Sequence, residues 1–73
     1  MLIENRTYKN LDGRSLVLVF EVSGNIFTIT RIGGVCGAAV ISSGKYNNRI
    51  CQGAADLAKA HNVALGQGYT QTK

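Results

Sequence analysis

The sequence predicts a small α+β domain, in which an antiparallel β-meander of three to four strands carries one C-terminal α-helix packed on one face. Three observations predict this fold: turn-forming pairs at Asp12-Gly13 and Gly24-Asn25, strand-forming residues around them, and helical periodicity after residue 48. The 73 residues contain no proline and no linker-like segment, so we expect a single domain over residues 1–73. Chains of this length bury only about 60% of the surface that their unfolded state exposes, which predicts a thin core.

The Gly24-Asn25 pair predicts the register of the central hairpin. Both residues tolerate the positive φ angles of a two-residue hairpin turn, and apolar strands flank them from Ser15 to Ile32. The opposed pairs that follow are Val22 with Phe27, Phe20 with Ile29, and Leu18 with Arg31. The larger apolar side chains therefore gather on one face of the hairpin, and the other face is more polar.

Two further strands complete the predicted meander. The Asp12-Gly13 pair is a second two-residue turn signal, and it adds a strand that begins near residue 5. This turn would pair Leu11 with Arg14, Lys9 with Leu16, and Tyr8 with Val17. The small apolar residues over 37–42 predict a fourth strand, which ends at the polar and flexible residues Ser42-Ser43-Gly44.

A single helix is predicted from about Arg49 to His61. Asn47 or Asn48 suits its N-cap, and Asn62 suits a left-handed residue at its C-terminal end. Apolar residues recur along it at spacings of three and four, as on one helical face. The predicted core is Phe20, Val22, Phe27, Ile29, Ala54, Leu57 and Ala58, with Leu18 and Ile50 at its margin.

The sequence allows two interpretations of residues 66–73 and two of the cysteine pair. Residues 66–73 either fray or form a short edge strand through Tyr69 and Thr70, and the polar, glycine-containing composition favours fraying. Cys36 and Cys51 fall short of a disulfide framework and are interpreted as small buried side chains. A bridge between them, closing a loop of about 15 residues, is the alternative.

Composition predicts a cytoplasmic protein that does not associate with membranes. No segment approaches the roughly 18 apolar residues that a bilayer-spanning helix needs. The first residues lack the basic start and long apolar run of a signal peptide. Hydrophobic content of 45% with 16% charged residues is ordinary for a globular chain.

The residues able to catalyse a reaction or hold a metal are few and poorly spaced. Cys36, Cys51 and His61 are the soft ligands, and their spacing is not that of a zinc site. Along a helix, His61 would lie about 15 Å from Cys51, too far to activate its thiol. The four carboxylates fit turns and solvated faces, and neither glycine-rich segment precedes a helix as phosphate-binding loops do. We therefore predict no catalytic residue, no cofactor, no metal and no small-molecule substrate.

The chain is predicted to be a non-enzymatic interaction module that binds another protein or self-associates as a homodimer. Four apolar residues lie on the hairpin face opposite Phe20 and Phe27, where a solvated face would carry polar residues. These predicted interface residues are Val17, Val19, Ile26 and Ile32. Small chains of this kind are often accessory proteins of a phage or mobile element that act on a host protein, and we expect that class here.

A basic nucleic-acid-binding protein is the alternative. All of the formal net charge of +4 lies after residue 21, which suits an acidic partner. The loop and helix N-terminus at 45–49 would contact phosphates while Tyr46 stacks on an unpaired base. The candidate contacts are Arg31, Lys45, Tyr46, Arg49 and Lys59. Strands followed by a basic-started, alanine-rich helix resemble the latter half of double-stranded RNA-binding domains over residues 15–62, although the lysine cluster and the leading helix of those domains are missing.

Overall fold

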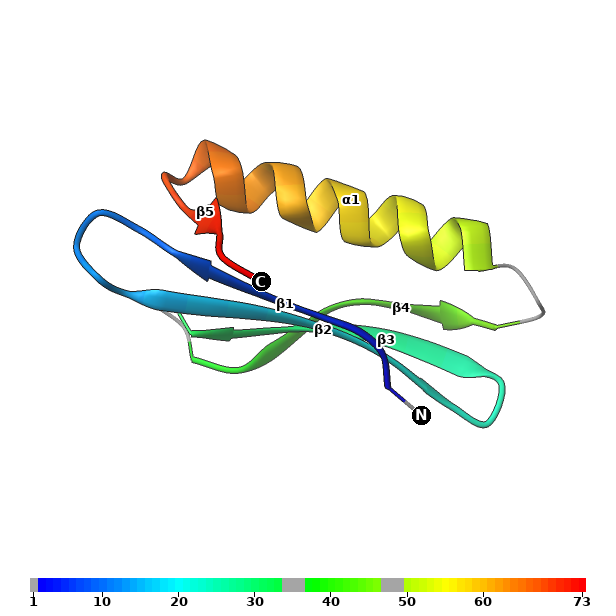
Figure 1. The fold of residues 1–73 in the computed structure, drawn as a ribbon. Helices are drawn as coiled ribbons and strands as arrows, with labels where there is room; N and C mark the ends of the chain where they lie inside the picture. Colours follow the sequence, from blue (N-terminus) through cyan, green and yellow to red (C-terminus); the bar gives the residue numbers. More distant parts are fainter. Residues whose placement is uncertain (1, 34–36, 47–49) are drawn as a thin grey trace.

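The computed structural model describes residues 2–33, 37–46 and 50–73. Within these ranges the elements are β1 (Leu2–Lys9), β2 (Ser15–Ser23), β3 (Ile26–Gly33), β4 (Ala39–Lys45), α1 (Ile50–Gly66) and β5 (Thr70–Gln71). The strands form one antiparallel sheet in the order β4-β3-β2-β1-β5, and α1 lies across one face of it (Figure 1). The predicted α+β fold is confirmed, with β5 added to the three to four strands that we expected.

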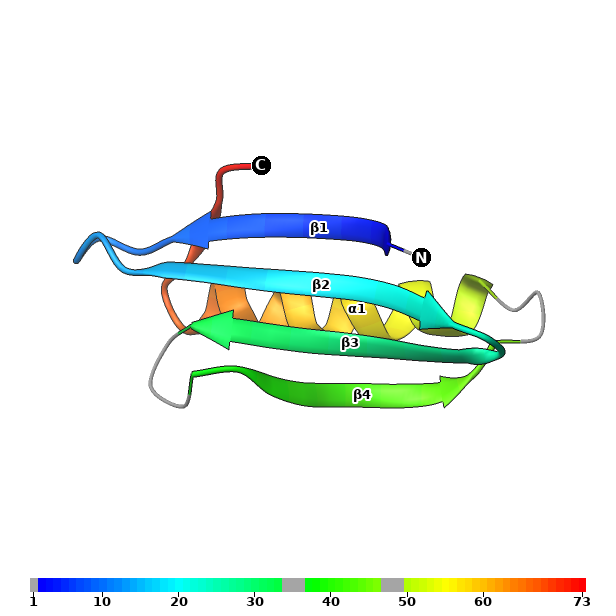
Figure 2. The ribbon, with the colours of Figure 1, turned by 90° about the horizontal axis from the view of Figure 1, so that it is seen from below.

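The sheet has two faces that differ in what covers them. The inner face is the one that packs against α1, and the outer face is the opposite one. Seen from below, the strands lie in front and α1 lies behind them (Figure 2). Successive side chains of a strand point to opposite faces, so the register of each pair decides which residues reach the core.

The central hairpin has the predicted register. Val22 lies opposite Phe27, Phe20 opposite Ile29, and Leu18 opposite Arg31. Only Gly24 and Asn25 separate the last opposed pair, and Gly24 has the left-handed φ of 62° that such a loop requires. The local turn chemistry and the apolar alternation therefore both predict the observed register of this hairpin.

The hairpin between β1 and β2 differs from the prediction by one residue. Its loop spans residues 11–13, three residues instead of two, and ends on Gly13 with a φ of 80°. A turn followed by a left-handed glycine is the usual form of a three-residue hairpin loop. Tyr8 consequently lies opposite Leu16, and the predicted pairing with Val17 is wrong. The shift moves Tyr8 from the outer face to the inner face.

The fourth strand begins and ends later than the predicted range 37–42. The Ser42-Ser43-Gly44 segment lies inside β4 and does not terminate it. Gly44 lies opposite Phe27, and a Cβ built on Gly44 would come within 2.8 Å of Phe27 Cε1. This glycine therefore makes room for an aromatic ring in the core.

The helix ends at Gly66, beyond the predicted end at His61. The left-handed residue that follows it is Gly68, with a φ of 90°, and not Asn62. The N–H groups of Gly68 and Tyr69 each donate to a carbonyl group in the last helical turn at 3.1 Å. This pair of bonds is the Schellman motif, which satisfies carbonyl groups that the end of a helix leaves unpaired.

The last residues form a short strand and do not fray. Tyr69 is buried at 8% exposure, and it anchors the chain as it leaves the helix. Beyond it, Gln71 pairs with Tyr8 and Thr70 pairs with Lys9. The edge-strand alternative for residues 66–73 is therefore the one observed, and β5 covers one end of β1.

The core lies between α1 and the inner face. The buried apolar residues are Tyr8, Leu16, Leu18, Phe20, Val22, Phe27, Ile29, Leu57, Ala64 and Tyr69. The four predicted members from the strands and Leu57 are confirmed, and Leu18 is fully buried where a marginal position was expected. The side chain of Ile50 lies outside the described residues.

The prediction that Ala54 and Ala58 face the core is wrong, since both are exposed. A Cβ built on Gly53 would overlap the ring of Phe20, so the helix backbone rests directly on that ring. This contact turns Gly53, Leu57 and Ala64 toward the sheet and rotates the two alanines toward solvent. Close approach of the helix does occur, but at Gly53.

Candidate interaction faces

The outer face of the sheet gathers β-branched side chains into adjoining rows. The register of the four long strands produces these rows. They are Thr7-Val17-Ile32, then Asn5-Val19-Thr30-Val40, then Leu2-Glu21-Thr28-Ser43, and last Ser23-Ile26-Lys45. No element among the described residues covers them, and Figure 2 shows this face toward the viewer.

The four predicted interface residues lie together on this outer face. Ile26 and Ile32 are 48% and 44% exposed, and Val17 and Val19 are shielded in part by their neighbours. Val40 of β4 is 60% exposed and extends the same surface. Sequence reasoning missed Val40, because no two-residue turn precedes β4 to set its register.

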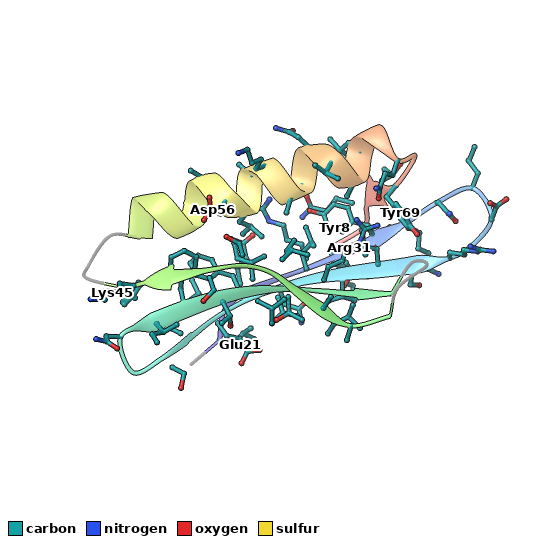
Figure 3. The ribbon with its side chains drawn as sticks, turned by 180° about the vertical axis from the view of Figure 1, so that it is seen from behind. Tyr8, Glu21, Arg31, Lys45, Asp56 and Tyr69 are labelled. Carbon is teal, nitrogen blue, oxygen red and sulfur yellow. The ribbon has the colours of Figure 1, made fainter. Side chains whose placement is uncertain are left out.

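The charged side chains of the paired outer-face positions are Lys9, Glu21 and Lys45, with Lys45 near the Glu21 end of the face and Lys9 at the other end. Lys9 lies at one end of the face, opposite Ser15. Glu21 lies six residues further along β2, about 20 Å away at the rise of a strand. Figure 3 shows Glu21 on the side of the sheet away from α1. At physiological salt, charges at this separation are screened from each other.

The candidate nucleic-acid contacts do not form one surface in the described part of the chain. Arg31 and Lys59 line a groove on the inner side of the sheet. Lys45 ends β4 with its side chain on the outer side, opposite the exposed Ile26. Tyr46 is partly buried and packs against the core. Arg49 lies outside the described residues.

Polar side chains on the inner face pair with one another. The Tyr8 hydroxyl lies 2.7 Å from His61 Nδ1, and the two rings pack with their centroids 5.6 Å apart. Arg6 and Glu4 form an ion pair at the margin of the core. Partial burial of the Arg6 guanidinium acts to lower its pKa, but hydrogen bonds and charge from Glu4 and Tyr8 outweigh burial and raise the pKa overall.

The described residues contain no cluster of three or more His, Cys, Asp or Glu side chains that would hold a metal ion. Cys36 and the Cys51 side chain lie outside the described residues, so their predicted burial and the alternative of a bridge between them both stay untested. In the same part of the chain, no helix combines the length and the apolar character needed to cross a bilayer.

Comparison with known proteins adds no relative. No protein-family model matches the chain, no curated protein matches it, and no solved structure matches its fold. The function is therefore inferred from the surfaces of the molecule itself.

Proposed function

We propose that the protein is a non-enzymatic interaction module whose outer sheet face binds the same face of a second copy. The observation that supports this is the make-up of that face, where aliphatic residues of neighbouring strands adjoin and no described element covers them. Exposed aliphatic side chains that gather on one uncovered face, here interleaved with threonine and serine, are typical of interaction sites.

The size of the outer face suits a dimer. Four strands of about eight residues span roughly 27 Å by 19 Å at standard strand rise and spacing, on the order of 500 Å² in projection. Side-chain relief adds to this area, which brings it near the ~800 Å² that each partner buries in a standard interface. Two such faces would stack about 10 Å apart as a β-sandwich with a shared core.

The placement of charge favours an antiparallel arrangement. A two-fold axis in the plane of the interface and perpendicular to the strands brings the Lys9 end of one copy over the Glu21 end of the other. Lys9 then gains Glu21 as an opposite charge, while Lys45 on β4 lies three strands away from Lys9 of the other copy. The same axis keeps the aliphatic rows of the two copies in contact, because it maps β2 onto β2.

Sedimentation analysis of wild type and a Val19→Lys variant tests this proposal. We expect a dimer for wild type and a monomer for Val19→Lys, because the lysine places a charge at the centre of the apolar rows. Ile32→Lys, at a more exposed position, should act in the same way without disturbing the strand. Leu65→Lys is the matched control, since Leu65 is exposed on α1 and should leave the dimer intact. A monomeric wild type at high concentration contradicts the proposal.

Charge reversal tests the antiparallel geometry. Lys9→Glu and Glu21→Lys should each weaken the dimer several-fold, and the double variant should recover most of the loss. Both side chains are exposed, so thermal melting should stay near that of wild type. If wild type is a monomer and binds a host protein through Val19 and Ile32, the outer face binds that protein and not a second copy.

A further inference from the structure

A groove of about 380 Å³ lies on the inner side of the sheet, between α1 and the strands β3 and β4. The backbone of α1 runs behind the middle of the sheet and not behind β4, as Figure 2 shows. Leu16 and Leu18, both fully buried, form its floor. Ile41 of β4 and Val63 of α1 form its walls, and both stay about half exposed.

Three charged side chains line the same groove: Arg31, Lys59 and Asp56. Asp56 already has a partner across the groove, since its Oδ2 accepts a hydrogen bond from Ser42 Oγ at 2.8 Å. Arg31 lies between α1 and the sheet (Figure 3) and donates from Nη2 to Gln67 Oε1 at 2.6 Å. Neither cation forms an ion pair within the described residues.

We propose that this groove binds a small amphipathic anion, a medium-chain aliphatic carboxylate. The aliphatic floor and walls take the chain, and Arg31 with Lys59 takes the carboxylate. A carboxylate is a stronger acceptor for a guanidinium than the neutral amide of Gln67, so the ligand would replace that hydrogen bond.

Volume and charge limit the class of ligand. The groove lies within the ~300–1,000 Å³ range of small-molecule sites. At roughly 30 Å³ for each heavy atom, it holds on the order of a dozen such atoms, the size of octanoate. With two cations against one acid, the lining is positive overall and disfavours an ammonium head group.

Titration of the full chain with octanoate, followed by NMR shifts and by calorimetry, tests this assignment. We expect octanoate to shift the signals of Ile41, Ala60 and Val63, and to bind at least tenfold more tightly than octylamine or octanol. Arg31→Gln and Lys59→Gln should each weaken octanoate binding about tenfold, the usual effect of losing one charge-assisted hydrogen bond. Lys45→Gln, outside the groove, is the matched control and should bind as wild type.

Two further variants separate octanoate binding in the groove from unfolding and from self-association. Val63→Phe should fill the groove and abolish octanoate binding while the protein still melts cooperatively, because Val63 is half exposed. Val19→Lys, on the opposite face, should bind octanoate as wild type does, which separates this site from self-association. Equal binding of octanoate and octylamine, or wild-type affinity in Arg31→Gln, overturns the proposal.

Discussion

Tyr8 places a hydroxyl group in a core whose other members, apart from Tyr69, are apolar. Its side chain is fully buried, and its hydroxyl bonds to His61 Nδ1. A buried hydroxyl without a partner costs about 1–3 kcal/mol, so this bond decides whether tyrosine is tolerated at that position. Because Tyr8 belongs to β1 and His61 to α1, the bond also aligns the helix with the edge half of the sheet.

A double-mutant cycle on Tyr8 and His61 measures this bond. His61→Phe should lower the free energy of unfolding by about 1 kcal/mol, because it removes the imidazole partner of the buried Tyr8 hydroxyl. Tyr8→Phe should cost about 1 kcal/mol, and the double variant should cost less than the two single changes together. Urea denaturation of the four proteins gives the coupling. Strict additivity would show that the two side chains touch without a stabilising hydrogen bond.

At the scale of elements, the position of α1 depends on the absence of one side chain. Gly53 places the helix backbone against the Phe20 ring, where a Cβ has no room. Alanine at an exposed helix position is more stable than glycine by about 1 kcal/mol. Gly53→Ala should nevertheless destabilise the protein by about 1–3 kcal/mol, because the helix must move away from the sheet. A glycine-to-alanine change at a helix position with free space around it separates this packing effect from helix propensity.

Gly66→Ala is the matched control, since a Cβ at Gly66 meets nothing within 4 Å and its φ is not left-handed. This variant should be neutral or slightly stabilising in the same thermal-melting experiment. The two glycine-to-alanine changes should therefore have opposite signs. A stabilising Gly53→Ala would mean that α1 does not rest on Phe20.

What could be predicted from sequence follows from how local each signal is. The central hairpin was predicted in full, because the Gly24-Asn25 turn and the apolar alternation lie within one short segment. The rotation of α1 about its own axis was not predicted, because the Phe20 ring that determines it belongs to a strand distant in sequence. The helix end has a local signal as well, at Gly68 and not at Asn62, since a glycine followed by the apolar Tyr69 is typical of a Schellman motif.

At the scale of the molecule, the outer face follows from local sequence signals, whereas the groove depends on how distant elements pack. Val17, Val19, Ile26 and Ile32 were assigned to one face by strand periodicity alone, since a period of two needs no tertiary knowledge. The groove could not be found in this way. It depends on where α1 crosses the sheet, and its lining includes both Arg31 of β3 and Lys59 of α1. Sequence therefore predicted the face built from consecutive strands and missed the site built from a strand and a helix.

The distribution of basic residues over the whole molecule makes a prediction about nucleic acids. A protein that neutralises four phosphates loses affinity with a slope near −4 in a plot of log affinity against log salt. Here the basic candidates with described positions lie on both sides of the sheet, with Arg31 and Lys59 in the groove and Lys45 on the outer side. One strand of nucleic acid cannot contact both sides, so we expect weak binding with a slope no steeper than about −2.

Fluorescence anisotropy with duplex DNA, single-stranded DNA and RNA at increasing salt measures that slope. Under this prediction, the double variant Lys45→Ala with Arg49→Ala should keep the slope of wild type. Lys45 is exposed, and exposed charges contribute little to stability, so Lys45→Ala alone should also keep the melting temperature. Lys9→Ala, a basic position outside the candidate set, is the matched control. A wild-type slope near −4 that falls by about two units in the double variant would contradict the prediction, because each lost phosphate contact removes about one unit. That result would make nucleic-acid binding through the 45–49 segment the better account of the molecule, with the outer face left to another role.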